Sequence, residues 1–289
     1  MSHPLLIGID GGGTTCRGAA LYGGKRVTRA VPGANATSDF EGAVAAVRAV
    51  VQALAEALDL PVERLAQAPA YLGMAGVVDA RVAERLRREL PFARLVIEED
   101  RRASVVDALA ARDGAVAVIG TGSFLARQTG GAMRFLGGHG LALGDEASGA
   151  WLGREALAAT LRVSEGWGAG SDLTRGLWDE MGGRSGIIAF ATRARSRDLA
   201  ELAPGVVAAA EGGDAQAVDL ITRGAGYIAG ALTALGWQSG EALCLTGGLG
   251  PVYAGALPTA MRAALTKPQG AAPDGALALA GRMAEGCLP

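Results

Sequence analysis

Three glycine-rich turns are the places where this sequence could carry chemistry, and each follows a short apolar segment. The first turn, in residues 8–15, reads GIDGGGTT, so a carboxylate stands directly before three glycines and two threonines. Backbone N–H groups of glycines can approach a phosphate closely, and threonine hydroxyls add further donors. The carboxylate of Asp10 could hold Mg²⁺, most simply through water, because Mg²⁺ dehydrates reluctantly. An ordinary hairpin turn is the alternative interpretation of this segment taken alone.

Two familiar phosphate-binding motifs do not account for the first turn. A P-loop needs a lysine after its glycines, and the only lysines are Lys25 and Lys267. The dinucleotide fingerprint needs glycine where Cys16 stands, and a helix where the pattern predicts a strand. The second turn, in residues 120–123 (GTGS), and the third, in residues 247–250 (GGLG), again place glycines after an apolar segment. This recurrence favours phosphate binding over unrelated hairpins.

The hydrophobic pattern predicts the elements that must position these turns. Strands are expected at residues 5–10, 16–22, 26–31, 70–72, 95–99, 115–119, 124–128 and 242–246. Helices are expected at residues 40–58, 80–90, 101–110, 148–162, 171–181, 204–210, 215–235 and 276–284. The order of strand, glycine turn and strand starts again at residue 115, which indicates two related α/β halves, the first ending near residues 111–114.

Composition excludes several classes of protein. Of 289 residues, 50% are hydrophobic and 19% are charged, which argues against a disordered chain. The formal net charge of -2 argues against nucleic-acid binding as the main function. Glycines and prolines interrupt the longest uncharged stretch, residues 242–261, so no membrane helix is expected. Three distant cysteines form no disulfide framework, and the start of the chain shows no signal peptide, so a cytoplasmic location is expected.

Several segments resemble the BadF/BadG-type ATPases and, among them, the N-acetylglucosamine and glucosamine kinases, with the bacterial glucosamine kinases nearest. They are IGIDGGGTTCR at 7–17, GMAG at 73–76, GGHG at 137–140, LGDEASG at 143–149 and KPQ at 267–269. The three turns in this order also resemble the actin-like fold of sugar kinases and hsp70-type ATPases. The resemblance implies an α/β, ribonuclease H-like duplicated fold with two domains around a nucleotide cleft. The expected domains are residues 1–112 with 274–289, and residues 113–273 with helical additions.

The resemblance also implies an activity and a set of site residues. The activity is ATP-dependent phosphorylation of the 6-hydroxyl of glucosamine or N-acetylglucosamine, with ATP and Mg²⁺, in a homodimer that binds neither membrane nor nucleic acid. Asp100 would be the general base that orients and deprotonates the sugar hydroxyl, and Asp10 would hold the metal. Implied nucleotide-binding residues are Asp10, Gly11, Gly12, Gly13, Thr14, Thr15, Arg17, Thr121, Gly122, Ser123, Gly247, Gly248 and Gly250. Implied sugar-binding residues are Asn35, Gly76, Glu99, Asp100, Thr121, Gly122, His139 and Asp145.

Each carboxylate has a plainer alternative. Glu98, Glu99 and Asp100 could form a solvated acidic loop, or Asp100 could cap the helix expected from residue 101, a role compatible with catalysis. Asp145 could merely place favourable charge before the helix at residue 148. His139 stands where acetylated-sugar kinases often have Trp, which puts an acetyl pocket in doubt; a hydrogen-bonding loop residue is the usual role of such a histidine. We therefore hypothesise that the acidic residues 98–100 favour the ammonium group of free glucosamine.

Other functions remain open from the sequence. A BadF-type ATPase that activates a partner enzyme carries paired cysteines for an iron–sulfur cluster, and Cys16, Cys244 and Cys287 resemble none of these ligands. A kinase acting on another N-acetylhexosamine, such as N-acetylmuramic acid, is a further alternative. A sugar-responsive regulator of the ROK type would need a DNA-binding helix-turn-helix. With only two histidines, His-rich zinc sites are excluded, and no GxSxG motif supports a serine hydrolase.

Overall fold

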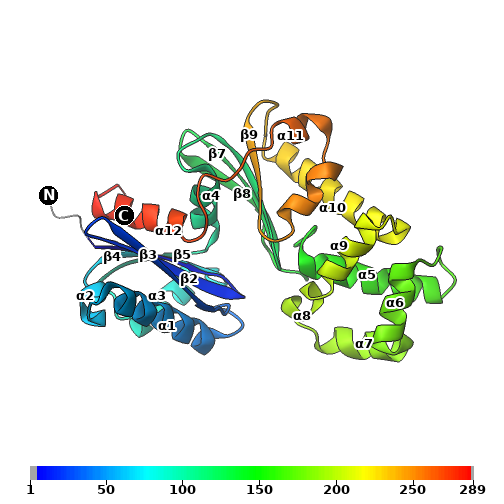
Figure 1. Cartoon of the computed structure of the whole chain (residues 1–289), viewed down its shortest axis with the longest axis horizontal. Helices are drawn as coiled ribbons and strands as arrows, with labels where there is room; N and C mark the ends of the chain where they lie inside the picture. The colour runs from blue at the N-terminus through cyan, green and yellow to red at the C-terminus, as the bar shows by residue number, and fades with distance from the viewer. Residues whose placement is uncertain (1–4, 288–289) are drawn as a thin grey trace. The chain divides into compact units, whose positions relative to one another are not determined.

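The computed structural model describes residues 5–287, and this part of the chain folds into two compact units (Figure 1). Unit 1 comprises the described residues up to 111 together with those from 268 onward, and unit 2 comprises residues 112–267. Each unit is built on one mixed β-sheet, with five strands in unit 1 and four in unit 2. Among the described helices, none is long and apolar enough to span a bilayer.

The sheet of unit 1 has the strand order β3-β2-β1-β4-β5. The bounds are β1 Leu6–Gly11, β2 Thr15–Tyr22, β3 Lys25–Pro32, β4 Pro69–Met74 and β5 Arg94–Glu98. β1, β2 and β3 form an antiparallel meander, whereas β4 and β5 run parallel to β1. The carboxyl ends of β1, β4 and β5 therefore lie along one edge of this sheet, the edge at which open α/β sheets usually bind ligands.

Helices cover both faces of this sheet. They are α1 Phe40–Leu58, α2 Val62–Ala66, α3 Ala80–Glu89, α4 Arg101–Leu109 and α12 Asp274–Ala284. α1 packs on the face of Gly18, where a Cβ atom would come 2.9 Å from Leu54. α12 packs on the other face, at Gly8, where a Cβ atom would lie 2.1 Å from the backbone nitrogen of Leu277. Both glycines thus permit close helix–sheet packing, and Figure 1 shows the red α12 and the blue α1 on opposite sides of the N-terminal sheet.

Unit 2 repeats the strand arrangement with a larger helical part. Its sheet has the order β8-β7-β6-β9, with β6 Gly114–Ile119, β7 Ser123–Thr129, β8 Ala132–Gly137 and β9 Ala242–Thr246. β9 runs parallel to β6 as β4 runs parallel to β1. The helices are α5 Gly149–Ser164, α6 Asp172–Met181, α7 Gly183–Arg193, α8 Ser196–Ala200, α9 Ala203–Glu211, α10 Ala215–Ala234, the 3₁₀ helix η1 Gly250–Ala256 and α11 Thr259–Ala263.

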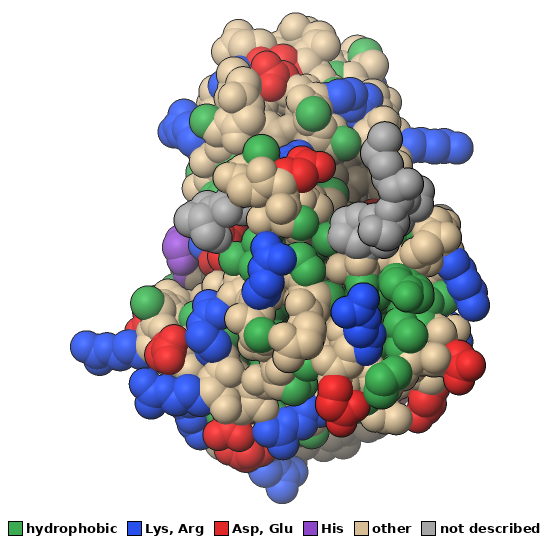
Figure 2. All heavy atoms as spheres, turned by 90° about the vertical axis from the view of Figure 1, so that its left-hand side faces the viewer, with side chains coloured by type: hydrophobic (Ala, Val, Ile, Leu, Met, Phe, Trp, Pro, Cys, Tyr) green, Lys and Arg blue, Asp and Glu red, His purple; other side chains and the backbone are tan. Residues whose placement is uncertain are grey.

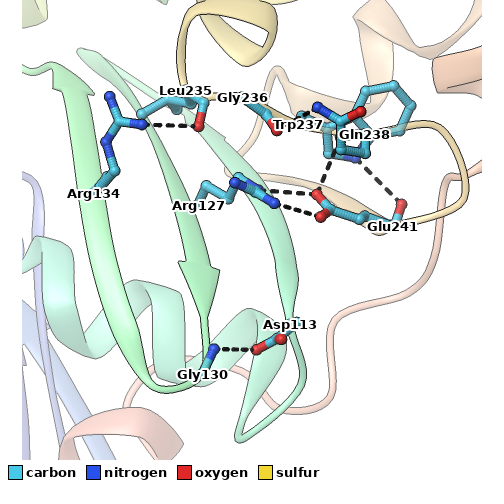
Figure 3. A network of polar contacts seen from close by, with 9 residues as sticks. All are labelled: Asp113, Arg127, Gly130, Arg134, Leu235, Gly236, Trp237, Gln238 and Glu241. Carbon is cyan, nitrogen blue, oxygen red and sulfur yellow. Dashed lines mark hydrogen bonds and ion pairs between the residues drawn. The ribbon is translucent and has the colours of Figure 1, made fainter.

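An arginine–carboxylate pair fixes the loop before β9 to the sheet of unit 2 (Figure 3). Arg127 on β7 donates from Nε to Oε2 of Glu241 at 2.9 Å, and its second nitrogen binds the other carboxylate oxygen. The same carboxylate accepts from the backbone N–H of Gln238 at 3.2 Å, while the Trp237 indole donates to the Glu241 carbonyl at 3.2 Å. A bidentate pair of this kind fixes geometry as well as charge. It therefore helps hold the start of β9, and with it the third turn, in register with β6 and β7.

The structure confirms the predicted strands and helices, with bounds that agree within two residues. The sequence pattern missed β8, α2, α7, α8, η1 and α11. Asp100 occupies the N-cap position of α4, as the alternative interpretation expected, but its side chain makes no capping hydrogen bond. Acidic and basic side chains are interspersed over the face shown in Figure 2, without a continuous basic area on that face.

Candidate functional site

Asp10 and Asp100 lie at the same edge of the sheet in unit 1. Asp10 at the end of β1 is paired with Gly73 on β4, and Gly73 is in turn paired with Glu98 on β5. A Cβ atom at Gly73 would lie 3.2 Å from the Cα of Asp100. A larger residue at Gly73 would therefore push away the backbone that carries Asp100, so the sequence keeps this approach open.

Burial and mutual repulsion raise the pKa values of the carboxylates at this edge. Burial, assisted by the negative charges of Asp100 and Asp107, raises the pKa of Asp10 to about 7, and the Arg17 guanidinium, 3.8 Å from its Oδ2, opposes this. Burial and the neighbouring Glu99 raise the pKa of Asp100 to about 6, against the opposing charge of Arg101. The edge is therefore a place where negative charge is costly and a cation would be stabilised.

The two glutamates beside Asp100 are paired with arginines. Glu98 accepts a hydrogen bond from the Tyr71 hydroxyl at 2.8 Å and from Arg102 at 3.1 Å. Glu99 forms an ion pair with Arg101. The hypothesis that residues 98–100 attract an ammonium group therefore rests chiefly on Asp100, because the glutamate charges are compensated locally.

The first turn contains one glycine that the fold does not require. Gly13 is exposed, has no positive φ, and a Cβ atom there would meet nothing within 4 Å. Gly12 differs, because its Cβ would lie 2.9 Å from the carbonyl oxygen of Thr15, and Gly11 would press on the Met74 side chain. Thr14 is exposed and its carbonyl accepts from Gly33 at 2.9 Å. A bare backbone at Gly13 leaves room for a ligand to approach.

The predicted sugar ligands Asn35 and Gly76 contact each other and adjoin the first turn. Oδ1 of Asn35 accepts from the N–H groups of Thr37 at 2.9 Å and Ser38 at 3.2 Å. Gly76 has φ 86°, and a Cβ atom there would lie 2.3 Å from Oδ1 of Asn35. The N–H of Ala75 donates to the carbonyl of Gly11 at 2.9 Å. Since the oxygen of Asn35 is engaged by backbone, its amide NH₂ is the group suited to a ligand oxygen.

In unit 2, Asp145 lies against the second turn. The backbone N–H groups of Ser123 and Gly140 lie near its carboxylate and favour its ionised form. A Cβ atom at Gly122 would lie 2.8 Å from its Oδ2. Asp145 is 6% exposed, and burial raises its pKa while the two N–H groups and His139 oppose this. A predicted sugar ligand and a predicted phosphate turn are thus in direct contact.

Three other predicted residues of this region have separate surroundings. The Ser123 hydroxyl is buried and donates to the carbonyl of Glu146 at 2.7 Å, so this hydrogen is engaged within the protein. Thr121 is half-buried and its carbonyl accepts from Ala150 at 3.2 Å. His139 is exposed. Ser148 caps α5: its hydroxyl oxygen accepts from the N–H of Trp151 at 3.1 Å. The sequence pattern did not assign this role, although a serine at the start of a predicted helix is a usual capping signal, because the acidic residues before it were considered instead.

The third turn lies beside the second, because β6 and β9 are parallel neighbours. Gly247 has φ 79°, and a Cβ atom there would lie 2.2 Å from the carbonyl oxygen of Ile119. Gly250 starts η1 and is packed against Leu245. Gly248 and, in the second turn, Gly120 resemble Gly13: neither has a positive φ, and neither has an atom within 4 Å of an added Cβ. Each turn therefore combines glycines that the fold needs with one that it does not.

The residues of unit 1 fit a hydrated Mg²⁺ ion. Within residues 5–287 no three His, Cys, Asp or Glu side chains cluster closely enough to hold a metal ion by themselves. Asp10 and Asp100 nevertheless offer carboxylate oxygens at an edge where their own negative charges are unfavourable. Mg²⁺ in phosphate-transfer sites is usually held by one or two carboxylates, with waters and substrate phosphates completing its shell. The donor set here matches that pattern.

Two repeated mixed sheets, each ending in glycine turns beside buried carboxylates, define an α/β fold of the actin-like class. The chain belongs to the BadF/BadG/BcrA/BcrD ATPase family, whose sequence profile matches residues 7–270.

Relatives of this chain include sugar kinases. It is 27% identical over 282 residues to "Glucosamine kinase GspK" of Vibrio cholerae, covering 96% of this chain and 95% of that protein. A solved structure of a candidate N-acetylglucosamine kinase from Chromobacterium violaceum is 32% identical, with a TM-score of 0.87, over 97% of this chain and 100% of that one. A ROK family glucokinase from Streptomyces griseus, solved with glucose and AMPPNP, has a TM-score of 0.57 at 21% identity, over 96% and 98% of the two chains. This last likeness shows the shared fold.

Proposed function

We propose that this protein is an ATP-dependent amino-sugar kinase that phosphorylates the 6-hydroxyl of glucosamine or N-acetylglucosamine. Two observations together carry the proposal. Each turn has a glycine whose added Cβ atom would meet nothing within 4 Å (the bare glycines Gly13, Gly120 and Gly248), and Asp10 and Asp100 lie at one edge of the sheet in unit 1. Glycines that the fold does not require are expected where phosphates approach backbone N–H groups. The names of the two kinase relatives support the substrate class.

In the proposed reaction Asp100 is the general base. The sugar oxygen attacks the γ-phosphorus of ATP, the bond to the β–γ bridging oxygen breaks, ADP leaves, and the hydroxyl proton passes to Asp100. Its pKa of about 6 means that most molecules hold Asp100 ionised at neutral pH, ready to accept that proton. Phosphoryl transfer otherwise depends on alignment and charge neutralisation rather than on covalent help from the protein.

The other residues have binding roles in this proposal. Asp10 and Arg17 are expected to act near the phosphates, with Asp10 holding Mg²⁺ through water; the ion would neutralise charge that develops on the phosphate oxygens. The glycines and threonines of the first and second turns bind phosphate, and Gly247, Gly248 and Gly250 adjoin the adenosine. Asn35 and Asp145 bind sugar hydroxyls, for which paired donors and acceptors are suited. Units 1 and 2 are taken as the two domains predicted from the sequence.

The experiment that tests the function is ADP release from Mg²⁺–ATP in the presence of single sugars. The panel contains glucosamine, N-acetylglucosamine, N-acetylmuramic acid, N-acetylmannosamine and glucose. The proposal expects the highest kcat/KM with glucosamine or N-acetylglucosamine, and phosphate on the 6-oxygen when the product is examined by NMR. A preference for N-acetylmuramic acid would assign another acceptor, and nucleotide binding with no accepted sugar would favour an ATPase that activates a partner protein.

A further inference from the structure

The backbone next to Asp145 is held in an unusual conformation. Asp145 has φ 59° and Ala147 has φ 67°, both in the left-handed region that side chains rarely adopt. Such residues cost free energy and persist only where their surroundings fix them. Here the Ser123 hydroxyl binds the carbonyl of Glu146 at 2.7 Å, and the fully buried Tyr253 hydroxyl binds the carbonyl of Ala147 at 2.6 Å. The backbone that directly follows Asp145 is therefore held by two independent hydrogen bonds.

The start of α5 determines which way the second turn faces. The N–H of Gly149 donates to the carbonyl of Gly120 at 2.8 Å, and the N–H of Ala150 donates to that of Thr121 at 3.2 Å. In a trans peptide the N–H points opposite to the C=O of the same unit. The N–H groups of Thr121 and Gly122 therefore point away from α5, in the orientation in which they could bind an anion.

The Asp145 carboxylate braces this turn from the side. It lies near the N–H of Ser123, which immediately follows the turn, and near that of Gly140 in the loop after β8. Its Oδ2 also occupies the space that a Cβ atom of Gly122 would need. The carboxylate thus packs against the turn at Gly122 and faces the loop around residue 140. A residue that served only as a sugar ligand would not require contacts of this kind.

We propose that Asp145 is a positioning residue for the nucleotide, in addition to its proposed contact with the sugar. It acts through its packing against Gly122 and its negative charge beside the Ser123 N–H, holding the second turn with the Thr121 and Gly122 N–H groups directed toward phosphate. The inference rests on the proposed function, in which this turn binds nucleotide. It predicts that Asp145 contributes to nucleotide affinity even when no sugar is present.

The test is the Kd of a non-hydrolysable ATP analogue with Mg²⁺, measured by calorimetry in the absence of any sugar. Asp145→Asn keeps the size of the side chain and tolerates the left-handed backbone, but replaces one acceptor oxygen by a donor. The matched control is Asp214→Asn in the same unit, because that carboxylate likewise lies beside backbone N–H groups and accepts those of Leu173 at 2.9 Å, Gln216 at 3.0 Å and Ala217 at 3.1 Å. Asp145→Asn is expected to weaken binding at least about tenfold, and Asp214→Asn by less than about twofold.

A second variant tests the same brace without touching a carboxylate. Tyr253→Phe removes the hydroxyl that holds the carbonyl of Ala147 and leaves the buried ring in place, so the fold should persist. It is expected to weaken nucleotide binding by about threefold. Nucleotide affinity equal to wild type in both variants, with a raised KM for sugar in Asp145→Asn, would overturn the inference and leave the kinase proposal standing. Wild-type protein that binds no nucleotide would overturn both.

Discussion

Replacing Asp10 by Asn should stabilise the ligand-free protein at alkaline pH. The Asp10 side chain is 13% exposed at the end of β1, and it shares its surroundings with the negative charges of Asp100 and Asp107. Burial and these charges raise its pKa from 3.8 to about 7, despite the Arg17 guanidinium nearby. Ionised Asp10 is therefore a cost to the folded state when no cation is bound, and the neutral amide of Asn removes that cost.

Proton linkage gives the sign and size of the change in unfolding free energy caused by Asp10→Asn. Because the folded state binds the proton more tightly than the unfolded state, the favourable contribution of Asp10 is fully present below pH 3.8 and is lost as the pH rises through about 7. The difference between the two pKa values corresponds to about 4 kcal/mol of unfolding free energy. Asp100 and Asp107 are coupled to Asp10, so we expect Asp10→Asn to gain about 2–4 kcal/mol at pH 8 and less than about 1 kcal/mol near pH 4.

The assay is urea unfolding of the ligand-free protein at pH 8, 6 and 4. The matched control is Asp59→Asn, which removes the same charge from an exposed residue at the end of α1. A stability gain that shrinks as the pH falls, absent from the control, supports the reasoning. A loss of stability at pH 8, or a gain that does not depend on pH, would refute it.

Three further predictions follow from the site. Gly13→Ala and Gly248→Ala should leave the free energy of unfolding unchanged or slightly increased, because their added methyl groups meet no atom within 4 Å. The same variants should raise the Kd for Mg²⁺–ATP at least about tenfold. An unchanged Kd would mean that these glycines do not mark a phosphate site. With Mg²⁺–ATP and sugar saturating, kcat should fall by about tenfold for each pH unit below pH 6 as Asp100 becomes protonated, since its pKa is about 6, and a flat acid limb would contradict its role as base. Glu99→Gln should change the ratio of kcat/KM for glucosamine to that for N-acetylglucosamine by less than about threefold, because Arg101 already pairs with Glu99; a larger change would restore Glu99 as a determinant of specificity.

The sequence was most informative where apolar periodicity and burial coincide. The stripe of Val44, Val47, Val51 and Leu54 predicted α1 with the bounds that the structure has, and these residues are buried against the sheet. β8 was missed because it lies at the edge of its sheet and most of its side chains are at least partly exposed, so it lacks a clear alternation. α7 was missed because Gly182 and Gly183, both with positive φ, stand at its start, and because it buries only Ile187 and so shows no apolar stripe.

Site residues could be named from motifs, but their partners could not. The motif around Asp10 indicated a phosphate turn, but not that Asp107, on α4, raises the pKa of Asp10. Asp107 is held in place by the packing of α12 on α4, where its carboxylate accepts the N–H of Gly275. The acidic residues 98–100 looked alike in the sequence. In the structure Glu98 and Glu99 are paired with Arg102 and Arg101, so their charges are compensated in a way that the sequence did not reveal.

The central claim is that Asp100 is the base of an amino-sugar kinase, and one comparison tests it most directly. Wild-type protein and Asp100→Asn are assayed for conversion of ATP and glucosamine to ADP and the 6-phosphate, and the Kd for Mg²⁺–ATP is measured in parallel. We predict that kcat falls at least about a hundredfold in the variant while the Kd changes by less than about threefold. A variant that retains turnover, or one that loses nucleotide binding and turnover together, would contradict this account.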